Sequence, residues 1–225
     1  MAKNIVSEFD DFSKNYTQDM VGCVPHYLEL ISSFAKHLPD HFNPKRILDL
    51  GCGNGNVTAQ LVSRFPNAVY TLLDASSEMI ELCSQRFKDY HVNYEQKFFH
   101  EFSFEENSYD LVVAGFSIHH CNEKEKQELF QKIHHSLEEG GFFLCSDLMM
   151  SKSNPNHPSL LKEWEAFVKT TFSDGQKWTW LMDHYEDFDK PTDYTKQIAW
   201  LQDVGFTSIQ LPFQEECWVH FQARK

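Results

Sequence analysis

The residues best placed to do chemistry in this chain are an aspartate and three alternate glycines at the end of a short apolar run. Residues 46–50 have the pattern of a buried strand that carries Asp49, and Gly51, Gly53 and Gly55 follow before a helical pattern begins. Glycine permits positive φ angles and lets a ligand approach the backbone closely. The helix behind the glycines offers unpaired N–H groups and the positive end of its dipole. Any one of these glycines alone indicates only a tight turn, whereas three in alternation after an acidic residue favour a ligand site.

A second carboxylate follows one strand later. Asp74 ends the apolar run 68–73, about 20 residues after the glycines, and this is the spacing at which an acidic residue reaches a ribose. Its oxygens can accept hydrogen bonds from both ribose hydroxyls. A strand-end acid, alternate glycines and a second acid in this order therefore predict a nucleoside site.

Two adjacent histidines follow another apolar run. His119 and His120 come just after residues 109–114, at the mouth of the predicted site, where an imidazole could serve as a general base. The structural alternative is that one histidine packs under the sheet while the other caps the next helix. Asp147, which ends the run 142–147, either faces the same site or serves as a cap or loop residue.

The chain contains 12 histidines, which raises the question of a metal site. It has no H-E-x-x-H motif and no cluster of His and Cys residues at ligand spacing, so we expect no metal. A different feature, the aromatic run KWTWLMDHY at 177–185, follows the last parallel strand pattern. This run forms either the core of a lid or a contact to a flat or apolar substrate.

Strand and helix patterns alternate from residue 46 to residue 148, which argues for a parallel α/β sheet joined by right-handed crossovers. Ser76 is a candidate N-cap for the second helix. Gly140 and Gly141 stand where a helix over 123–138 is expected to stop. The predicted strands of this part are 46–50, 68–73, 92–95, 109–114 and 142–147.

The flanking segments are predicted to be helical, with a final pair of strands. The runs 206–211 and 217–223 are close enough in sequence to pair as an antiparallel ribbon. We expect one domain over 1–225. Its parts are a helical N-terminal cover (1–45), a ligand-binding half (46–148), a lid insertion (150–190) and a last helix with the strand pair (191–225).

These motifs resemble those of class I S-adenosylmethionine-dependent methyltransferases. The stretch Asp49–Gly55 is similar to the D/E-x-G-x-G-x-G signature of that family. It departs from the G-x-G-x-x-G of dinucleotide-binding proteins because Asn occupies position 56. Later segments resemble the family's fourth strand, its L-x-P-G-G turn (here without the proline) and its A-G-F before the last two strands; they are 109–114, 137–143 and 204–206.

The resemblance implies a Rossmann-like α/β fold with a mostly parallel sheet in the order 3-2-1-4-5-7-6, flanked by helices and a helical lid. It implies S-adenosyl-L-methionine as the cofactor, bound at the carboxyl ends of the strands. By the same resemblance, Asp49 lies near the methionine amino group and Asp74 holds the ribose. The other residues that the resemblance places around the cofactor are Gly51, Cys52, Gly53, Ala75, Met79 and Gly115.

The sequence departs from the family pattern at the adenine. Many members carry an aspartate after the third strand that accepts a hydrogen bond from the adenine amino group. Here Lys97-Phe98-Phe99 occupies that place. Adenine recognition at Phe98 and Phe99 is therefore expected to use backbone groups and stacking.

A closer resemblance lies in the N-terminal stretch FDDFSKNYTQDMVGCVPHY, which is similar to the entry segment of carboxy-S-adenosylmethionine synthases. In that group a tyrosine closes over the cofactor. The matching residue is Tyr27, which could equally be a core residue. The carboxylated cofactor needs an arginine to pair its extra carboxylate, and 178–185 contains none.

We therefore expect methyl transfer from the ordinary cofactor to a small-molecule acceptor, mainly by in-line positioning in a closed pocket. One alternative is a synthase of the carboxy-S-adenosylmethionine type that modifies the cofactor itself. A second alternative is a non-catalytic module that binds the cofactor. An NAD-dependent oxidoreductase fits less well because the glycine spacing differs.

Composition limits the partners and the location. The chain has 225 residues, with 20 Lys+Arg against 33 Asp+Glu and a formal net charge of −13, which disfavours nucleic acid as a partner. Its six cysteines include no C-x-x-C pair and indicate reduced thiols. No stretch has the pattern of a signal peptide or a membrane span. We expect a cytoplasmic protein that is a monomer or a homodimer.

Overall fold

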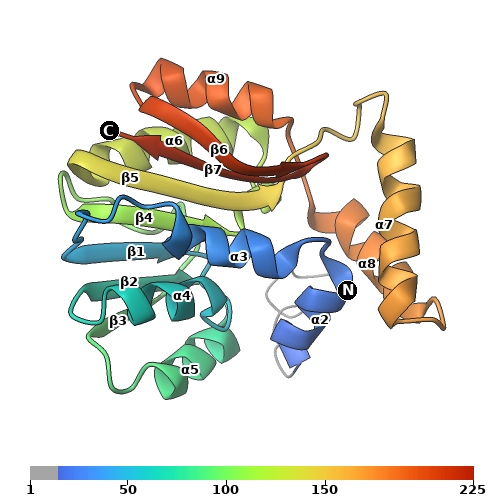
Figure 1. Cartoon of the computed structure of the whole chain (residues 1–225), viewed down its shortest axis with the longest axis horizontal. Coiled ribbons are helices and arrows are strands. Elements are labelled where there is room, and N and C mark those ends of the chain that lie inside the picture. The colour runs from blue at the N-terminus through green and yellow to red at the C-terminus, as the bar shows by residue number, and fades with distance from the viewer. Residues whose placement is uncertain (1–14) are drawn as a thin grey trace.

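The apolar runs of the sequence form the strands of one sheet, which helices cover on both faces in the computed structural model (Figure 1). The structure describes residues 15–225. The strands are β1 (Arg46–Leu50), β2 (Val69–Asp74), β3 (Val92–Gln96), β4 (Tyr109–Gly115), β5 (Leu137–Leu148), β6 (Thr207–Glu215) and β7 (Trp218–Arg224). The helices are α2 (Tyr16–Cys23), α3 (Tyr27–Lys36), α4 (Asn56–Arg64), α5 (Ser77–Arg86), α6 (Glu123–Ser136), α7 (His157–Thr171), α8 (Gln176–Phe188) and α9 (Tyr194–Val204), with a short 3-10 helix η2 (Ile118–His120).

The sheet has the strand order β3-β2-β1-β4-β5-β7-β6. β3, β2, β1, β4 and β5 pair in parallel, whereas β7 runs antiparallel to both β5 and β6. The expected order and the expected antiparallel ribbon are both confirmed. Because the parallel strands end on one side, the loops that follow them meet at a single edge of the sheet.

Side chains of successive strand residues enter two separate cores, as the two-residue period of a strand requires. Ile47 belongs to a core formed with α3, α4 and α5, while Leu48 belongs to a core formed with α6 and α9. The same alternation separates Val113 from Val112 on β4. Apolar residues on both faces explain why the strand patterns are nearly continuous apolar runs.

The turn between α6 and β5 differs from the expectation. The predicted helix over 123–138 ends at Ser136, and Leu137 is already extended and paired with Tyr109 on β4. Gly140 and Gly141 therefore do not stop the helix but lie inside β5, where the pairing with β4 shifts register. Gly140 has φ +80°, a conformation that glycine adopts without strain.

A helical cover lies beyond the carboxyl edge of the parallel strands, on the right of Figure 1, and consists of α2, α7 and α8. Trp164 Nε1 on α7 donates to the carbonyl oxygen of Cys23 at 2.6 Å, and Lys177 on α8 pairs with Asp19 on α2 at 2.9 Å. The segment before β1 and the segment after β5 therefore form one joint cover over the site.

Two further observations concern the whole described range. None of the helices in residues 15–225 has the length and apolar character needed to cross a membrane. The six cysteines are all unpaired thiols, and five of them are buried.

Candidate active site

The glycine turn after β1 has the conformation that its sequence predicts. Gly51, Gly53 and Gly55 have φ angles of +69°, +52° and +83°. A Cβ on Gly51 would lie 2.4 Å from the Cβ of Ser117, so only glycine fits that position. The N–H groups of Gly51 and Cys52 donate to the Leu73 carbonyl at 2.8 and 3.0 Å, which fixes the turn to the end of β2.

Asp74 joins this turn to the next one. One of its carboxylate oxygens accepts from Gly53 N and the other accepts from Ser76 N, both at 2.9 Å. Ser76 in turn caps α5 by accepting from Met79 N, as its sequence position predicts. The glycine turn after β1 and the turn before α5 are far apart in sequence, and both are hydrogen-bonded to the Asp74 carboxylate.

A cavity of about 1070 Å³ lies above this turn. Eight of the residues singled out from the sequence line it: Gly51, Gly53, Asp74, Ala75, Met79, Phe98, Phe99 and His120. Tyr16 of α2 lines it as well, although its sequence context had not marked it as a site residue. The side chains of Phe98 and Phe99 offer apolar surface, and Phe98 is 42% exposed.

Four other expected residues lie behind the cavity wall. Tyr27 is a core residue: its hydroxyl accepts from Asn56 Nδ2 at 2.8 Å and its ring packs against Phe116. Cys52 is buried with its Sγ 3.9 Å from that of Cys83. The remaining two are Gly115, which packs tightly against Val57, and Asp49.

Asp49 is fully buried at the end of β1. Its Oδ2 accepts from the Thr58 hydroxyl at 2.6 Å, while its Oδ1 has no hydrogen-bond partner among the described residues. Burial raises the pKa of Asp49 to about 7, against the hydrogen bond from Thr58, which lowers it. A buried carboxylate oxygen without a donor suits a cationic ligand group nearby.

A second cavity of about 80 Å³ adjoins the first. The two share Tyr16, Phe116 and His120 as lining residues. Its walls are otherwise mostly apolar and aromatic, and its polar lining comes from histidines and one aspartate. The aromatic residues are Tyr16, Phe116, Trp164, Trp180 and Trp218, and the polar ones are His119, His120, His184 and Asp189.

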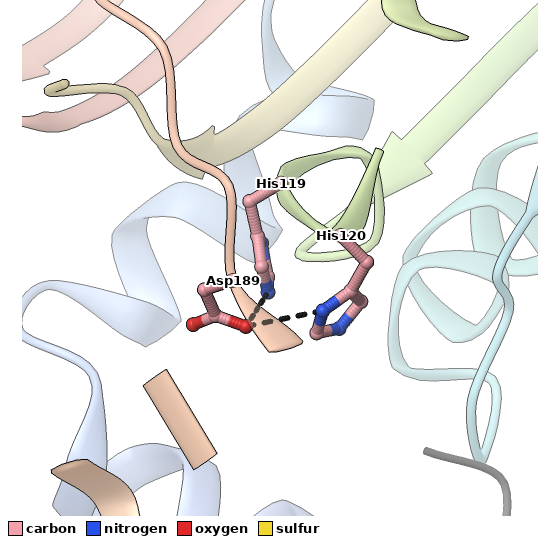
Figure 2. A group of neighbouring side chains, drawn as sticks. All are labelled: His119, His120 and Asp189. Atoms are coloured by element: carbon pink, nitrogen blue, oxygen red, sulfur yellow. Dashed lines mark ion pairs between the residues drawn. The ribbon is translucent and has the colours of Figure 1, made fainter. Parts of the chain in front are cut away.

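The two predicted histidines meet Asp189 at the boundary between the cavities (Figure 2). His120 Nδ1 lies 3.1 Å and His119 Nε2 lies 3.6 Å from Asp189 Oδ1. His184 Nε2 lies at 3.6 Å from the same oxygen. On its other side, His119 Nδ1 is hydrogen-bonded to Asp147. We call these five residues the histidine–aspartate cluster.

The charges in this cluster follow from burial and from its aspartates. Burial would lower the pKa of His119, but Asp147 and Asp189 outweigh it and raise this pKa to about 9. Burial and the neighbouring His119 lower the pKa of His120, and burial lowers that of His184 to about 4. Burial would raise the pKa of Asp189, yet the histidines around it lower it. The cluster therefore holds His119 as a cation between two carboxylates at neutral pH.

The structure rules out helix capping as the role of either histidine of the pair. Asn122, not a histidine, caps α6, and with Glu125 it forms a full capping box. Asp147 lines neither cavity but contacts His119 from behind, where its carboxylate also accepts from His119 N at 2.9 Å. Asp189 was missed because no motif surrounds it and because it reaches the cluster only through the fold.

The residues of the larger cavity fit S-adenosylmethionine. Gly51 and Gly53 expose backbone with no side chain over it, and Asp74 presents its carboxylate at the wall. Asp49 keeps its unpaired oxygen just behind the turn. Ala75, Met79 and the two phenylalanines provide apolar surface for a flat ring.

Comparisons with known proteins indicate a methyltransferase. Residues 47–141 match the family described as a methyltransferase domain. A solved structure from Thermotoga maritima, described as a SAM-dependent methyltransferase and possible histamine N-methyltransferase, has the same fold, with a TM-score of 0.66 and 13% identity over 99% of this chain and 100% of that one. The family match, the strand order and the relatives below support a class I S-adenosylmethionine-dependent methyltransferase with S-adenosylmethionine as its cofactor.

Within that class, the chain is similar to proteins named carboxy-S-adenosyl-L-methionine synthase. It is 26% identical to the one from Helicobacter hepaticus, over 95% of this chain and 91% of that protein. It is 23% identical to the one from Campylobacter lari, over 96% and 92% of the two chains.

Proposed function

We propose that this protein transfers a methyl group to a small molecule held in the smaller cavity. The observation that carries the proposal is the junction of the two cavities at Tyr16, Phe116 and His120. A bound cofactor supplies an electrophilic methyl group on a sulfonium sulfur. Residues at the junction then hold the acceptor in line with that methyl group and keep water out, which is the main source of rate in such a transfer.

Each wall of the larger cavity has a separate task in this proposal. Asp74 accepts hydrogen bonds from the ribose, and the backbone of Gly51 and Gly53 lies along the methionyl part. Ala75, Met79, Phe98 and Phe99 contact the adenine, whose polar groups pair with backbone. Because Tyr27, Cys52 and Gly115 lie behind the wall, we assign them to the support of the turn and of α4 rather than to contact.

The acceptor is small and carries an apolar or flat group, because the smaller cavity has a volume of only about 80 Å³ and aromatic walls. His120 stands at its boundary with the cofactor cavity and His119 lines the smaller cavity beside it, so we assign them to contact with the reacting end of the acceptor. The net charge of −13 argues against a nucleic acid acceptor. This charge instead favours a neutral or cationic small molecule as the acceptor. The reduced thiols are consistent with a location in the cytoplasm.

A second candidate function is that of the relatives, which are named as synthases of the carboxylated cofactor. All four arginines of the chain lie in the described range, and none lines either cavity. The larger cavity does contain lysines, among them Lys190. Mass spectrometry of the ligand that co-purifies with the protein distinguishes the two functions. A carboxylated cofactor would contradict the proposal that the protein uses ordinary S-adenosylmethionine as a methyl donor. A non-catalytic binding module is distinguished by its lack of turnover with amine, thiol and hydroxyl acceptors.

Calorimetry with S-adenosylmethionine tests the proposal. Asp74→Ala removes a charged acceptor of hydrogen bonds, and such bonds contribute about 1.5–3 kcal/mol, so we expect the affinity to fall at least about tenfold. Asp89→Ala, at an exposed site after α5, is the matched control and should leave the affinity unchanged. Absence of binding by folded wild-type protein, or equal binding by the Asp74 variant, would contradict the proposed site.

A further inference from the structure

Asp189 differs from the other carboxylates of the site because its Oδ1 is buried among the imidazoles of three histidines. The residue is 8% exposed, and no described residue donates a well-directed hydrogen bond to this oxygen. The histidine nitrogens that face it from His119 and His184 are 3.6 Å away, which is too long for a hydrogen bond. His120 Nδ1 is closer, at 3.1 Å, so three imidazoles gather around one carboxylate oxygen at ion-pair distances.

We propose that His119, His120 and Asp189 bind a divalent transition-metal ion at the boundary between the two cavities (Figure 2). One ligand atom from each residue lies within 4.8 Å of the others. Two ligands that are each about 2.1 Å from a metal lie about 3.0 Å apart at a right angle and about 3.4 Å apart in a tetrahedron. The observed separations of 3.1 and 3.6 Å between Asp189 and the two histidines match those values.

The surroundings orient the ligands as in established metal sites. A metal-bound histidine commonly donates its second ring N–H to a carboxylate, which fixes the ring and its tautomer. Asp147 accepts that hydrogen bond from His119 Nδ1 and leaves Nε2 to face Asp189, so a bound ion takes the place of the Nε2 proton of the His119 cation, which is released to water. Asp147 is itself held, because it accepts from the backbone N–H groups of His119 and Leu148, both at 2.9 Å.

The backbone holds the two halves of the site together. The N–H of Lys190 donates to the carbonyl oxygen of His119 at 2.7 Å, so the segment after α8 is attached to η2. The side chain of Lys126 continues this attachment, since Nζ donates to the Lys190 carbonyl and to the Thr192 hydroxyl. Asp189 therefore stays beside the histidines in the absence of a metal, and little ordering remains to be done on binding.

The donor set indicates the kind of ion. Two imidazoles and one carboxylate suit zinc, iron, cobalt or nickel, whereas magnesium and calcium prefer oxygen ligands throughout. His184, with its Nε2 3.6 Å from the same carboxylate oxygen, is the candidate for a further ligand. Three protein ligands leave a position open on the ion, as in catalytic sites.

The position of the ion gives it a role, and this part of the inference rests on the proposed function. His120 lines both cavities, so an ion beside it contacts an acceptor whose nucleophilic atom points toward the cofactor. A divalent ion lowers the pKa of a hydroxyl or thiol that it contacts, so the acceptor releases its proton to water before transfer. The acceptor atom then forms its bond to the methyl carbon, and the electron pair of the broken bond stays on sulfur.

Zinc binding to the full chain tests the metal site. After treatment with a chelator and dialysis, the wild-type protein is titrated with Zn²⁺ by calorimetry, and Co²⁺ is added in parallel to record its absorption spectrum. We expect one ion per chain and a Co²⁺ spectrum with the bands of imidazole coordination. Asp189→Asn, which keeps the side-chain volume, and His120→Ala should each abolish this binding. Asp147→Asn should weaken it about 10–100-fold, the usual cost of losing a partner behind a metal ligand.

The controls separate this inference from the proposed function. His135→Ala, at an exposed position on α6, should bind Zn²⁺ like the wild type. The affinity for S-adenosylmethionine is measured on the same chelated samples. If wild-type protein binds the cofactor but no Zn²⁺, or if Asp189→Asn binds Zn²⁺ like the wild type with an unchanged melting temperature, the metal site is wrong and the methyl-transfer proposal stands. Loss of cofactor binding by wild type would instead overturn the proposed function.

Discussion

His220 on β7 is a titratable side chain inside the core, away from both cavities. It is fully buried, its Nδ1 shares a 2.7 Å hydrogen bond with Ser146 Oγ, and its ring packs edge-on against Phe34. Its Nε2 has no hydrogen-bond partner among residues 15–225. Burial lowers the pKa of His220 to about 3, so the folded protein holds this histidine neutral.

Acid should therefore destabilise the protein partly through His220. An unfolded histidine has a pKa of about 6.5, so from pH 6.5 down to about 3 the unfolded state binds a proton that the folded state rejects. Stability is full above pH 6.5 and falls with decreasing pH by up to about 1.4 kcal/mol per pH unit. Urea unfolding between about pH 7 and pH 5 should show a shallower loss for His220→Phe than for wild type. His135→Phe, at an exposed site, should follow the wild type. If the free energy of unfolding falls equally steeply with pH in the His220 variant and the wild type, protonation of His220 does not contribute to the acid sensitivity.

Single residues also show where sequence reasoning ends. The glycines and Asp74 could be predicted because the backbone turn itself requires their residue types in a fixed order. Asp189 could not, since a carboxylate that acts through tertiary contact needs no neighbours of its own in sequence. Tyr27 and Tyr16 show the same limit. The tyrosine chosen by motif packs in the core, and the one that lines both cavities lies eleven positions earlier on α2.

At the scale of an element, the turn between β1 and α4 requires glycine for two reasons, a left-handed backbone conformation and the lack of space for a Cβ. Gly51 has φ +69°, and a Cβ there would lie 2.4 Å from Ser117. Gly175, before α8, has a similar φ of +77°, but a Cβ at that position would have no neighbouring atom within 4 Å. A substitution at Gly175 therefore measures the cost of the left-handed conformation alone, without a steric clash.

The two glycines form a matched pair for substitution. Gly175→Ala should cost about 1–2 kcal/mol, because a residue with a Cβ is strained in a left-handed conformation. Gly51→Ala should cost about 1–3 kcal/mol more because Ser117 and the turn must move apart. Urea unfolding measures both, and calorimetry should show weakened cofactor binding for Gly51→Ala alone. If the two variants lose the same stability, contact with Ser117 does not constrain the turn.

The elements themselves were largely predictable from periodicity, because buried strands and amphipathic helices leave different apolar spacings. The exception is the junction of α6 and β5. A Gly-Gly pair after a helical pattern normally indicates a helix stop, but here the chain becomes extended at Leu137 and pairs with β4 before the glycines. The pairing of Leu137 with β4 sets the point where α6 ends and β5 begins, and the local sequence pattern contains no information about this pairing.

At the scale of the whole molecule, the helical segment before β1 and the lid segment after β5 are in contact with each other. α2 precedes the sheet and α7 and α8 follow β5, yet Trp164 and Lys177 bond to α2 through Cys23 and Asp19. Tyr16 at the start of α2 lines both cavities, and Trp164 and Trp180 line the smaller one. Access to the site therefore depends on elements that hold one another in place.

Hydrogen exchange should show this coupling directly. Cofactor bound against Tyr16 restrains α2, and the contacts of α2 should pass the restraint to α7 and α8, so amide exchange in all three helices should slow when S-adenosylmethionine is added. α9, which packs on the far face with α6, is the internal control and should be unaffected. Trp164→Phe keeps an aromatic ring but removes the donor to the Cys23 carbonyl, so the slowing in α7 and α8 should shrink while that in α2 remains. Slowing confined to the glycine turn in the wild type would show that the cover does not respond to the cofactor as a unit.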